Sequence, residues 1–521
     1  MRLLIRTDGD TIIGGGHVMR CLTLANEATE RGHHVEFVMA ARLNTMSQRV
    51  RDSGFKVHDI SPSSPPPHDP AGPAHSNWLA TSWQEDARAT AEAAQKLGPD
   101  WIIWDHYGLD ARWTHEVRSA TYTAQFMAID DLDDRALGSE RVLDQTRMSE
   151  TARLNPADAT LTGASFALLR PEFAALRPTA LAGRNDTVTR ILIAPGMVDG
   201  SGLAPLALRA LAAFPDIEVE VVMGSSSQTV IEVETLLATR PKATLALDAD
   251  NMAERMARAD LCIGAGGMTS WERCCLGLPA MAICTADNQK AVLDALDRAG
   301  AVTALSLEQA RNPNILHHAL IRTISKCRNM SKAAAGLCDG LGAGRVMDVL
   351  EAKLRPMELG DTQTLYDWRN QSHIRAASLD TDELVWSNHE SWMRKTLRGN
   401  EGLWMIYSEG SRDLGHVNAQ IVAGKTWSWG FYVGAENAPR GAGLRMLATF
   451  LKVLFDRRDV TALEAKVRVE NTRSIALHKR FGFRQIGVDD PQVLAFRLDR
   501  CDVKLAAGIW QPVKGENSDA P

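Results

Sequence analysis

Short apolar runs alternate with stretches of helical spacing along the first two thirds of the chain. The runs with the length of buried strands fall at 3–5, 35–39, 101–104 and 126–129, and then at 190–193, 219–223, 244–247 and 261–263. Because both sets of runs alternate with helical stretches, the pattern predicts two consecutive α/β domains. Each is expected to be a doubly wound, Rossmann-type parallel sheet.

The pattern changes after residue 354. Residues 403–433 alternate between apolar and polar with a period of two over three short runs, which predicts an antiparallel sheet. A strand ending near residue 471 and a helix over 472–480 follow. The predicted segments are two α/β halves at 1–175 and 176–353, an α+β domain at 354–505 and a polar tail at 506–521.

Composition excludes several classes of partner. The 521-residue chain has a formal net charge of −6, so nothing favours nucleic acid or an anionic membrane surface as a partner. No run of 18 apolar residues and no signal-peptide core is present, and we expect a cytoplasmic protein. The eight cysteines show no metal-binding or redox spacing, so we expect reduced thiols and no bound metal.

A glycine turn joins the first predicted strand to the first predicted helix. Gly14, Gly15, Gly16 and His17 form this turn, and Arg20 lies one helical turn further on. Glycines let the backbone approach a ligand closely, and the amides at a helix start favour anions. Because the positive helix end disfavours protonation of His17, a neutral imidazole is available as a base. The alternative is a tight connection in which His17 only caps the helix.

Two acidic turns follow predicted central strands of the same domain. Asp105 and Tyr107 come directly after one strand, and Asp130 and Asp131 follow another. In a doubly wound sheet, side chains beyond the carboxyl ends of the strands line the ligand crevice. The alternative for each aspartate is to cap the next helix.

The second α/β domain has a comparable turn. Gly266, Gly267, Met268 and Thr269 lead from a strand into a helix, and Glu272 follows one turn later. We predict that the amides of this turn hold a diphosphate. The Glu272 carboxylate is expected to accept hydrogen bonds from ribose hydroxyls.

A third glycine turn lies in the C-terminal domain. It comprises Arg440, Gly441, Ala442, Gly443 and Leu444, and it opens a helix after the predicted sheet. A basic, glycine-rich turn between a strand and a helix predicts a pyrophosphate site.

Residues 1–350 resemble a known family through several ordered motifs. These are the stretches around His17, 105–110, 129–132, 168–173 and 266–279, followed by Asn288 and Gln289. Together they resemble the UDP-sugar hydrolases of pseudaminic acid biosynthesis (PseG), which are built like two-domain GT-B glycosyltransferases of the MurG type. The resemblance implies that His17 is catalytic, with Tyr107 as its active-site neighbour and Asn288 near the sugar. The turn at 196–199 departs from the family's Gly-Gly-Ser/Thr-Asp pattern.

The predicted substrate contacts of this half come from the same motifs. They are Gly15, Gly16, Arg20, Asp105, Gly266, Gly267, Met268, Thr269, Glu272 and Gln289. The ligand that the resemblance implies is a UDP-linked amino sugar.

Residues from about 354 to 500 resemble the acetyl-CoA-dependent GNAT acyltransferases. Arg440 and Gly443 fit the family's pyrophosphate loop, whereas Arg445 stands where glycine or alanine is usual. Asn471 and Ser474 also match. Acetyl-CoA is therefore the implied co-substrate, held by residues 440–444 with Asn471 and Ser474.

The same resemblance implies roles near the reacting groups. A backbone amide between Phe431 and Val433 is the implied oxyanion donor. His478 takes the place of the tyrosine that protonates the coenzyme thiolate in many relatives; the alternative is that His478 only packs beside the pantetheine. The motif 368–370 and the pair His389 and Trp392 resemble the branch that acetylates amino sugars, including PseH.

The two resemblances imply one bifunctional enzyme of pseudaminic acid biosynthesis, a nonulosonic acid pathway that serves flagellin glycosylation. It is expected to acetylate the 4-amine of a UDP-linked sugar and then to hydrolyse the product, releasing UDP with inversion. One alternative is a GT-B glycosyltransferase fused to an acetyltransferase, which requires an acceptor sugar. Another is a non-catalytic ligand-binding scaffold, which tolerates loss of His17 or His478. The sequence leaves the oligomeric state open.

Overall fold

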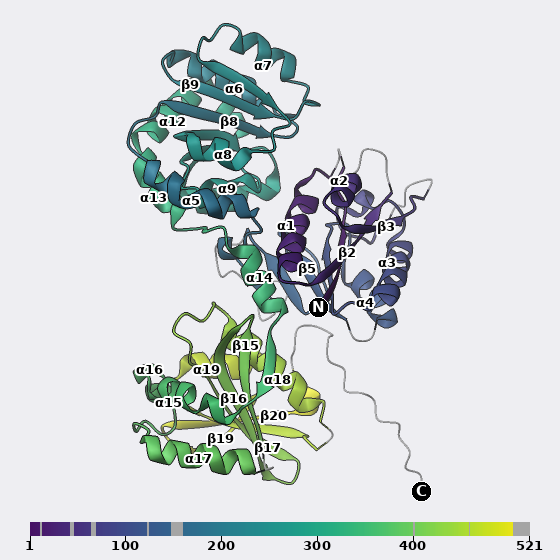
Figure 1. The fold of residues 1–521 in the computed structure, drawn as a ribbon, viewed down its shortest axis with the longest axis vertical. Coiled ribbons are helices and arrows are strands. Elements are labelled where there is room, and N and C mark those ends of the chain that lie inside the picture. Colours follow the sequence, from purple (N-terminus) through teal and green to yellow (C-terminus); the bar gives the residue numbers. More distant parts are fainter. Residues whose placement is uncertain are drawn as a thin grey trace.

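A computed structural model describes residues 1–10, 13–41, 46–63, 69–121, 124–146, 160–399, 402–457 and 459–503. Two Rossmann-type domains lie beside each other, and a third domain with a twisted mixed sheet lies below the first in the view of Figure 1. This confirms the predicted fold class. The polar tail predicted at 506–521 falls outside the described residues.

The first domain is built on a seven-stranded parallel sheet of order β3-β2-β1-β4-β5-β6-β7. Its strands are β1 (Arg2–Thr7), β2 (His34–Ala40), β3 (Lys56–Ile60), β4 (Trp101–Asp105), β5 (Gln125–Ile129), β6 (Arg141–Asp144) and β7 (Thr160–Thr162). Its helices are α1 (Gly16–Glu30), α2 (Ser47–Asp52), α3 (Trp83–Leu97) and α4 (Ala111–Ala120). Strand β1 is apolar on both faces because α1 covers one face and α3 and α4 cover the other.

The second domain repeats this plan with the sheet order β10-β9-β8-β11-β12-β13. Its strands are β8 (Arg190–Gly196), β9 (Glu218–Met223), β10 (Ala243–Leu247), β11 (Leu261–Ala265), β12 (Ala280–Cys284) and β13 (Val302–Ser306). Its helices are α5 (Pro171–Gly183), α6 (Leu203–Ala210), α7 (Val230–Leu237), α8 (Met252–Arg258), α9 (Thr269–Cys275), α10 (Lys290–Arg298), α11 (Leu307–Arg311), α12 (Pro313–Ser325) and α13 (Cys327–Ala335). In both domains the strand order reverses beside the first strand, where such sheets open a ligand crevice.

Helix α14 (Gly342–Leu350) crosses back from the second domain to the first. Its buried side chains Val346 and Met347 join the same hydrophobic core as α1. Gly342 is required there, because a Cβ would lie 2.2 Å from the carbonyl oxygen of Ala167. The predicted division at residue 353 assigns α14 to the second domain by sequence order, whereas its packing places it on the first.

The same helix attaches the third domain. Asp348 pairs with Arg31 at 2.8 Å, and its carbonyl accepts from the amide of Gly410 in the third domain. Glu351, just past the helix, lies 2.6 Å from His33. These contacts gather at the amino-terminal edge of the first sheet, near the chain start marked N in Figure 1.

The third domain has a seven-stranded sheet of order β14-β15-β16-β17-β18-β20-β19. Its strands are β14 (Lys353–Pro356), β15 (Gly402–Glu409), β16 (Arg412–Ala423), β17 (Thr426–Val433), β18 (Ala462–Arg468), β19 (Arg484–Asp490) and β20 (Val493–Asp499). Its helices are α15 (Thr362–Asn370), α16 (Ser372–Ala377), α17 (Trp386–Arg398), α18 (Ala442–Phe455) and α19 (Thr472–Arg480).

Strands β17 and β18 are parallel and pair only at 426–428 with 462–464. Beyond these residues β17 pairs only with β16 and β18 only with β20. The sheet therefore opens into a V, and the backbone groups on the inner side of β17 face the opening.

Among the described residues, no helix is both long and apolar enough to cross a bilayer. The eight cysteines are all free.

Candidate active sites

His17 lies at the start of α1 and meets a carboxylate from β4. Its Nδ1 is 2.5 Å from Oδ1 of Asp105. Arg20, one turn further along α1, donates to the same carboxylate from Nε at 2.6 Å and from Nη2 at 2.7 Å. All three residues are buried, with His17 the most exposed at 8%. The pairing of β1 with β4 places Asp105 beside the glycine turn, as the strand pattern predicts.

The protonation of this pair follows from the environment of Asp105. Burial alone raises the pKa of its carboxyl, but the charges of Arg20 and His17 and their hydrogen bonds outweigh burial and hold that pKa well below its usual range. Because an ionised carboxylate only accepts hydrogen bonds, Nδ1 of His17 is the donor. When the ring carries this one proton, Nε2 keeps a free lone pair, as a general base requires.

Arg20 and Asp105, both predicted as substrate contacts, bond to each other in the structure. The donors of Arg20 go to Asp105 and, through Nη1, to Asp131. Asp105 in turn accepts from both Arg20 and His17. The geometry therefore makes both residues positioning groups that orient His17. Sequence spacing predicted that Arg20 and Asp105 lie at this edge of the sheet. It did not predict that they bond to each other and that Asp105 bonds to His17.

Tyr107 lies directly against His17. Its ring meets the imidazole edge-on at 4.6 Å, and its hydroxyl donates to Oδ2 of Asp131 at 2.9 Å. Burial, followed by the charge of Asp131, raises the pKa of Tyr107 well above its usual value, so the phenol stays protonated. The structure thus brings together His17 and Tyr107, both predicted for this site.

Sequence reasoning missed Trp78, on the short 3-10 helix η1 (Ser76–Trp78). Its ring stacks on Tyr107 at 5.8 Å and meets the edge of His17 at 6.1 Å. His75 adds a further ring, 4.6 Å from Trp78. These residues follow the proline-rich stretch at 62–73, where no periodicity directs attention to them. A tryptophan and a histidine beside such a loop were the only available signal.

Asp130 forms a turn and not the helix cap of the alternative prediction, because no helix lies in the described residues between β5 and β6. Its carboxylate accepts from the amides of Leu132 and Asp133 and pairs with Arg135 at 2.7 Å. It therefore shapes the turn after β5, whereas Asp131 faces the site.

The glycine turn before α1 has the expected conformation. Gly14 has a φ of +82°, which favours glycine, and a Cβ on Gly15 would lie 2.7 Å from the sulfur of Met46. A Cβ on Gly16 would meet nothing within 4 Å. Among the described residues, no side chain caps helix α1, so its first amides are left without a side-chain acceptor. An anion fits this position.

The predicted diphosphate turn of the second domain also forms. Gly266 packs on Leu293, where a Cβ would lie 2.5 Å from Cδ1. Gly267 has open space around it. The carboxylate of Glu272 lies 4.0 Å from Arg170, and burial raises its pKa. Thr269 begins α9, and Met268 contacts Gln145 of the first domain at 3.1 Å, so this turn faces the crevice between the domains.

Two further predicted residues lie on the 3-10 helix η5 (Asp287–Gln289). Asn288 occupies its middle position, and its side chain is outside the described residues. Gln289 accepts from the amide and hydroxyl of Thr285, so it holds the loop after β12. In the divergent turn at 196–199, Asp199 caps α6 by accepting from the amides of Leu203 and Ala204.

The third glycine turn caps α18. Gly441 has a φ of +84° and precedes Ala442, the first residue of the helix. The divergent Arg445 is buried and donates to Glu409 from Nε at 2.7 Å and to the carbonyl of Arg440 at 3.0 Å. Arg445 therefore holds the loop at 440–444 through its bond to the Arg440 carbonyl. A Cβ on Gly441 would lie 2.8 Å from Nη1 of Arg445. The amides of Gly443 and Leu444 begin a helix that suits a pyrophosphate.

The end of β17 lies beside this loop. A Cβ on Gly443 would lie 3.2 Å from Val433, and both Phe431 and Val433 are partly exposed where β17 leaves β18. Asn471 caps α19 by accepting from the amide of Ser474. The residues predicted to hold acetyl-CoA therefore surround the open V of the sheet.

His478 departs from its predicted role as an acid. Its Nε2 accepts from the indole N–H of Trp429 at 3.1 Å, and its Nδ1 donates to the carbonyl of Ser474 at 2.7 Å. Burial lowers the pKa of His478 to about 4. Both nitrogens are engaged and the ring is neutral, so the geometry supports the alternative in which His478 packs. The match of His478 to the family's tyrosine position does not reveal that Trp429 donates a hydrogen bond to the His478 ring.

We expect His478→Phe to keep the acetylation rate within about threefold of the wild type, whereas loss of a positioned acid lowers it about a hundredfold. The variant leaves the Trp429 N–H unpaired, at a cost of about 1–3 kcal/mol. Because the folded pKa is depressed, wild-type stability falls as pH drops from about 6.5 toward 4, and the variant lacks this slope. Acetylation kinetics and thermal unfolding between pH 4 and 8 measure both effects. A hundredfold slower variant would restore the acid role.

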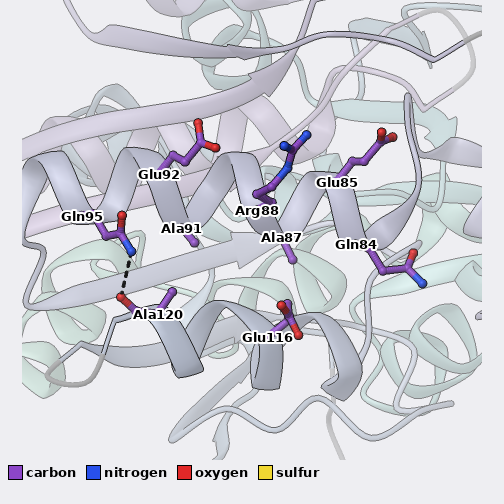
Figure 2. Close-up of a pocket in the computed structure, with 9 residues that line it drawn as sticks. All are labelled: Gln84, Glu85, Ala87, Arg88, Ala91, Glu92, Gln95, Glu116 and Ala120. Atoms are coloured by element: carbon purple, nitrogen blue, oxygen red, sulfur yellow. Dashed lines mark hydrogen bonds between the residues drawn. The ribbon is translucent and has the colours of Figure 1, made fainter.

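A groove of about 380 Å³ lies away from both sites. Figure 2 shows it between α3 and α4, lined by alanines at its floor and by charged side chains at its rim. It lies on the face of the first sheet opposite α1 and contains none of the predicted site residues. Within the described residues, no group of three or more His, Cys, Asp or Glu side chains is arranged to hold a metal ion.

Comparisons with known proteins cover both parts of the chain. Residues 352–484 match the acetyltransferase (GNAT) domain. An uncharacterised protein of Methanocaldococcus jannaschii is 23% identical over 93% of this chain and 97% of its own. The spore coat polysaccharide biosynthesis protein SpsG of Bacillus subtilis is 28% identical over 35% of this chain and 57% of its own.

Solved structures resemble each part separately. MurG of Acinetobacter baumannii aligns with 67% of this chain and 99% of its own at 16% identity, with a TM-score of 0.49. Aminoglycoside acetyltransferase AAC(6')-Ib in complex with coenzyme A and kanamycin aligns with 29% of this chain and 96% of its own at 18% identity, with a TM-score of 0.26. The chain therefore consists of two Rossmann-type domains followed by a domain that matches the GNAT acetyltransferases.

Proposed function

We propose that this chain is a bifunctional nucleotide-sugar enzyme of pseudaminic acid biosynthesis. Its GNAT domain transfers an acetyl group from acetyl-CoA to the 4-amine of a UDP-linked 4-amino-4,6-dideoxy-N-acetyl-altrosamine. Its GT-B-like pair then hydrolyses the product to UDP and 2,4-diacetamido-2,4,6-trideoxy-altropyranose.

The observation that carries the hydrolase half is the oriented His17. Asp105 fixes its Nδ1, and Nε2 is left as a base beside helix α1. Nε2 takes a proton from water as the water oxygen bonds to the anomeric carbon. The bond from that carbon to the UDP oxygen breaks, and the electron pair leaves with UDP. Attack opposite UDP inverts the anomeric centre.

The departure of UDP requires anion-binding groups more than a strong general acid, because UDP is a stable leaving group once amides hold it. The turn at 266–269 supplies such amides across the crevice from His17. Glu272 lies one turn further on and is placed to accept from ribose hydroxyls. The side chains of Trp78 and Tyr107 give the sugar an apolar wall beside the base.

The acetyltransferase half is supported by the match to the GNAT domain and by the open V between β17 and β18. The loop at 440–444 accepts the pyrophosphate, and an amide near Phe431 to Val433 meets the thioester oxygen. Because an amine attacks a thioester readily once both are aligned, positioning supplies most of the rate.

The decisive experiment incubates the full chain with the UDP-linked 4-amino sugar and acetyl-CoA in water enriched in ¹⁸O and follows the sugar by NMR. We expect a new N-acetyl methyl signal, then an inverted free sugar that carries ¹⁸O at its anomeric carbon. Acetylation with UDP release only after an acceptor sugar is added would instead support a glycosyltransferase. Binding without either reaction would support a scaffold.

A further inference from the structure

His416 is a buried histidine of the GNAT domain that neither proposed reaction has yet used. It lies on β16, is 2% exposed, and has no hydrogen-bond partner at Nδ1 or Nε2 among the described residues. Leaving both polar atoms of a buried ring unsatisfied is costly, so such a group indicates a partner that arrives later.

The position of His416 relates it to the open V of the sheet. In the register of the sheet, His416 lies between Ile406 on β15 and Tyr432 on β17. Tyr432 belongs to the segment 431–433 that is expected to supply the oxyanion donor. The ring of His416 is therefore one strand away from the place where the acetyl carbonyl is expected.

The two faces of this sheet separate the two substrates. Met446 and Phe450 of α18, the helix that follows the pyrophosphate loop, pack on one face. On the other face, Ile406 of β15 packs with Trp368 of α15 and Met393 of α17. Neighbouring residues in a cross-strand row point to the same face, so His416 lies on the side opposite α18. A co-substrate held at α18 leaves this second face for the amine.

Aromatic rings surround His416 on that face. Trp404 stacks on it at 5.9 Å, and Tyr432 lies at 5.5 Å. Trp392 meets Trp404 at 5.3 Å and is 37% exposed, so a row of rings leads from His416 to the surface. Flat aromatic rings suit the apolar faces of sugars and of nucleobases.

We propose that His416 is the base of the acetyl transfer and receives the proton of the acceptor amine. This inference rests on the proposed acetyltransferase function. The amine nitrogen bonds to the thioester carbon, and the resulting tetrahedral adduct gives its N–H proton to the imidazole. The C–S bond then breaks, and the protonated imidazole returns the proton to the departing thiolate. The products are the amide and CoA thiol, and His416 is regenerated neutral.

The charges around His416 suit this transient role. Burial lowers its pKa to about 4, so the ring is neutral at rest and ready to accept. Asp361 of the 3-10 helix η6 (Leu359–Asp361) favours the protonated ring, although Arg355 pairs with it at 2.7 Å. Tyr432 on β17 stays protonated because burial raises its pKa. On α17, the Nε2 of His389 lies 3.1 Å from the carbonyl of Thr362.

The test compares full-length wild type with His416→Phe and with His373→Phe, an exposed histidine of α16 that serves as the control. Acetylation is measured as CoA release between pH 6 and 10 with three amines: the UDP-linked 4-amino sugar, kanamycin and spermidine. Acetyl-CoA affinity and thermal unfolding are measured alongside. The choice of phenylalanine keeps an aromatic ring and removes both nitrogens, so folding is expected to survive.

We expect His416→Phe to lower kcat/KM for the amine about ten- to a hundredfold at pH 7. The loss should shrink at high pH, where hydroxide can take the proton of the tetrahedral adduct in place of the imidazole, while acetyl-CoA affinity stays within twofold. Wild-type kcat/KM in the variant would overturn the proposal. An equal loss at every pH, accompanied by weaker acetyl-CoA binding, would also overturn it, because that pattern indicates packing alone.

The amine panel separates this inference from the proposed function. If the wild type acetylates kanamycin or spermidine but not the UDP-linked sugar, the proposed substrate is wrong, and the His416 comparison is made with the amine that is used. A His416→Phe loss confined to the catalytic rate then still supports the base assignment.

Discussion

Replacing His17 by alanine is expected to lower the rate of UDP release about a hundredfold or more, the usual contribution of a positioned acid or base. The reason is geometric, because Asp105 fixes Nδ1 and leaves Nε2 as the base for water. UDP binding should be unchanged, since in the proposed function the amides of the second domain hold the diphosphate. Release of UDP from the diacetylated sugar and calorimetric binding of UDP measure the two quantities.

The matched control is His115→Ala, which removes an exposed histidine from α4 of the same domain. It should release UDP at the wild-type rate. A His17→Ala protein with normal turnover would reduce His17 to a structural partner of Asp105, whose loss affects stability alone. Unfolding of the variant is checked by its thermal transition.

Replacing Asp105 by asparagine should affect both chemistry and stability. An amide N–H in place of a carboxylate oxygen opposes the donors of His17 and Arg20, so the ring loses its fixed tautomer. We expect a loss of roughly a thousandfold in UDP release, on the scale of such orienting carboxylates. Buried Arg20 loses one of its two counter-charges, at a cost of about 3 kcal/mol. Hydrogen exchange of peptides spanning β4 and α1 measures the local free energy of opening.

The pH dependence of stability gives a second test of Asp105. The pKa of Asp105 is depressed in the folded protein. Its contribution to stability is therefore fully present above about pH 4 and is lost as the pH falls toward the folded-state pKa. The wild-type opening free energy should therefore decline below pH of about 4, and Asp105→Asn should lack this decline. Asp59→Asn, a change at a half-exposed carboxylate on β3, is the control. Identical acid profiles in all three proteins would contradict the assignment.

Periodicity predicted the strands well because buried parallel strands are apolar on both faces, as Leu3, Leu4 and Ile5 illustrate. It also predicted that His17 and Asp105 share one edge of a sheet, since carboxyl ends of parallel strands meet there. Pattern could not reveal that Arg20 binds Asp105, because side-chain partners depend on rotamers and on the exact register.

Other misses have different physical origins. Trp78 lies on a 3-10 helix of three residues, which is too short to leave a periodic signal. Helix α14 returns to the first domain, and sequence order alone cannot show a chain that crosses back. His478 sits at the family's tyrosine position, yet its nitrogens are used by Trp429 and Ser474. The unpartnered ring of His416 becomes visible only when its neighbours on three strands are known.

Under the proposed two-step function, the attachment of the GNAT domain by α14 sets the route of the acetylated intermediate. His17 lies at the first turn of α1, whereas Arg31, which holds α14, follows its last residue. A helix of 15 residues is about 22 Å long, so the two catalytic units occupy opposite edges of the first sheet. The intermediate must leave one unit and diffuse to the other. Its concentration in solution therefore rises before UDP appears, producing a lag, and unlabelled intermediate added from outside dilutes an isotopic label in the final sugar.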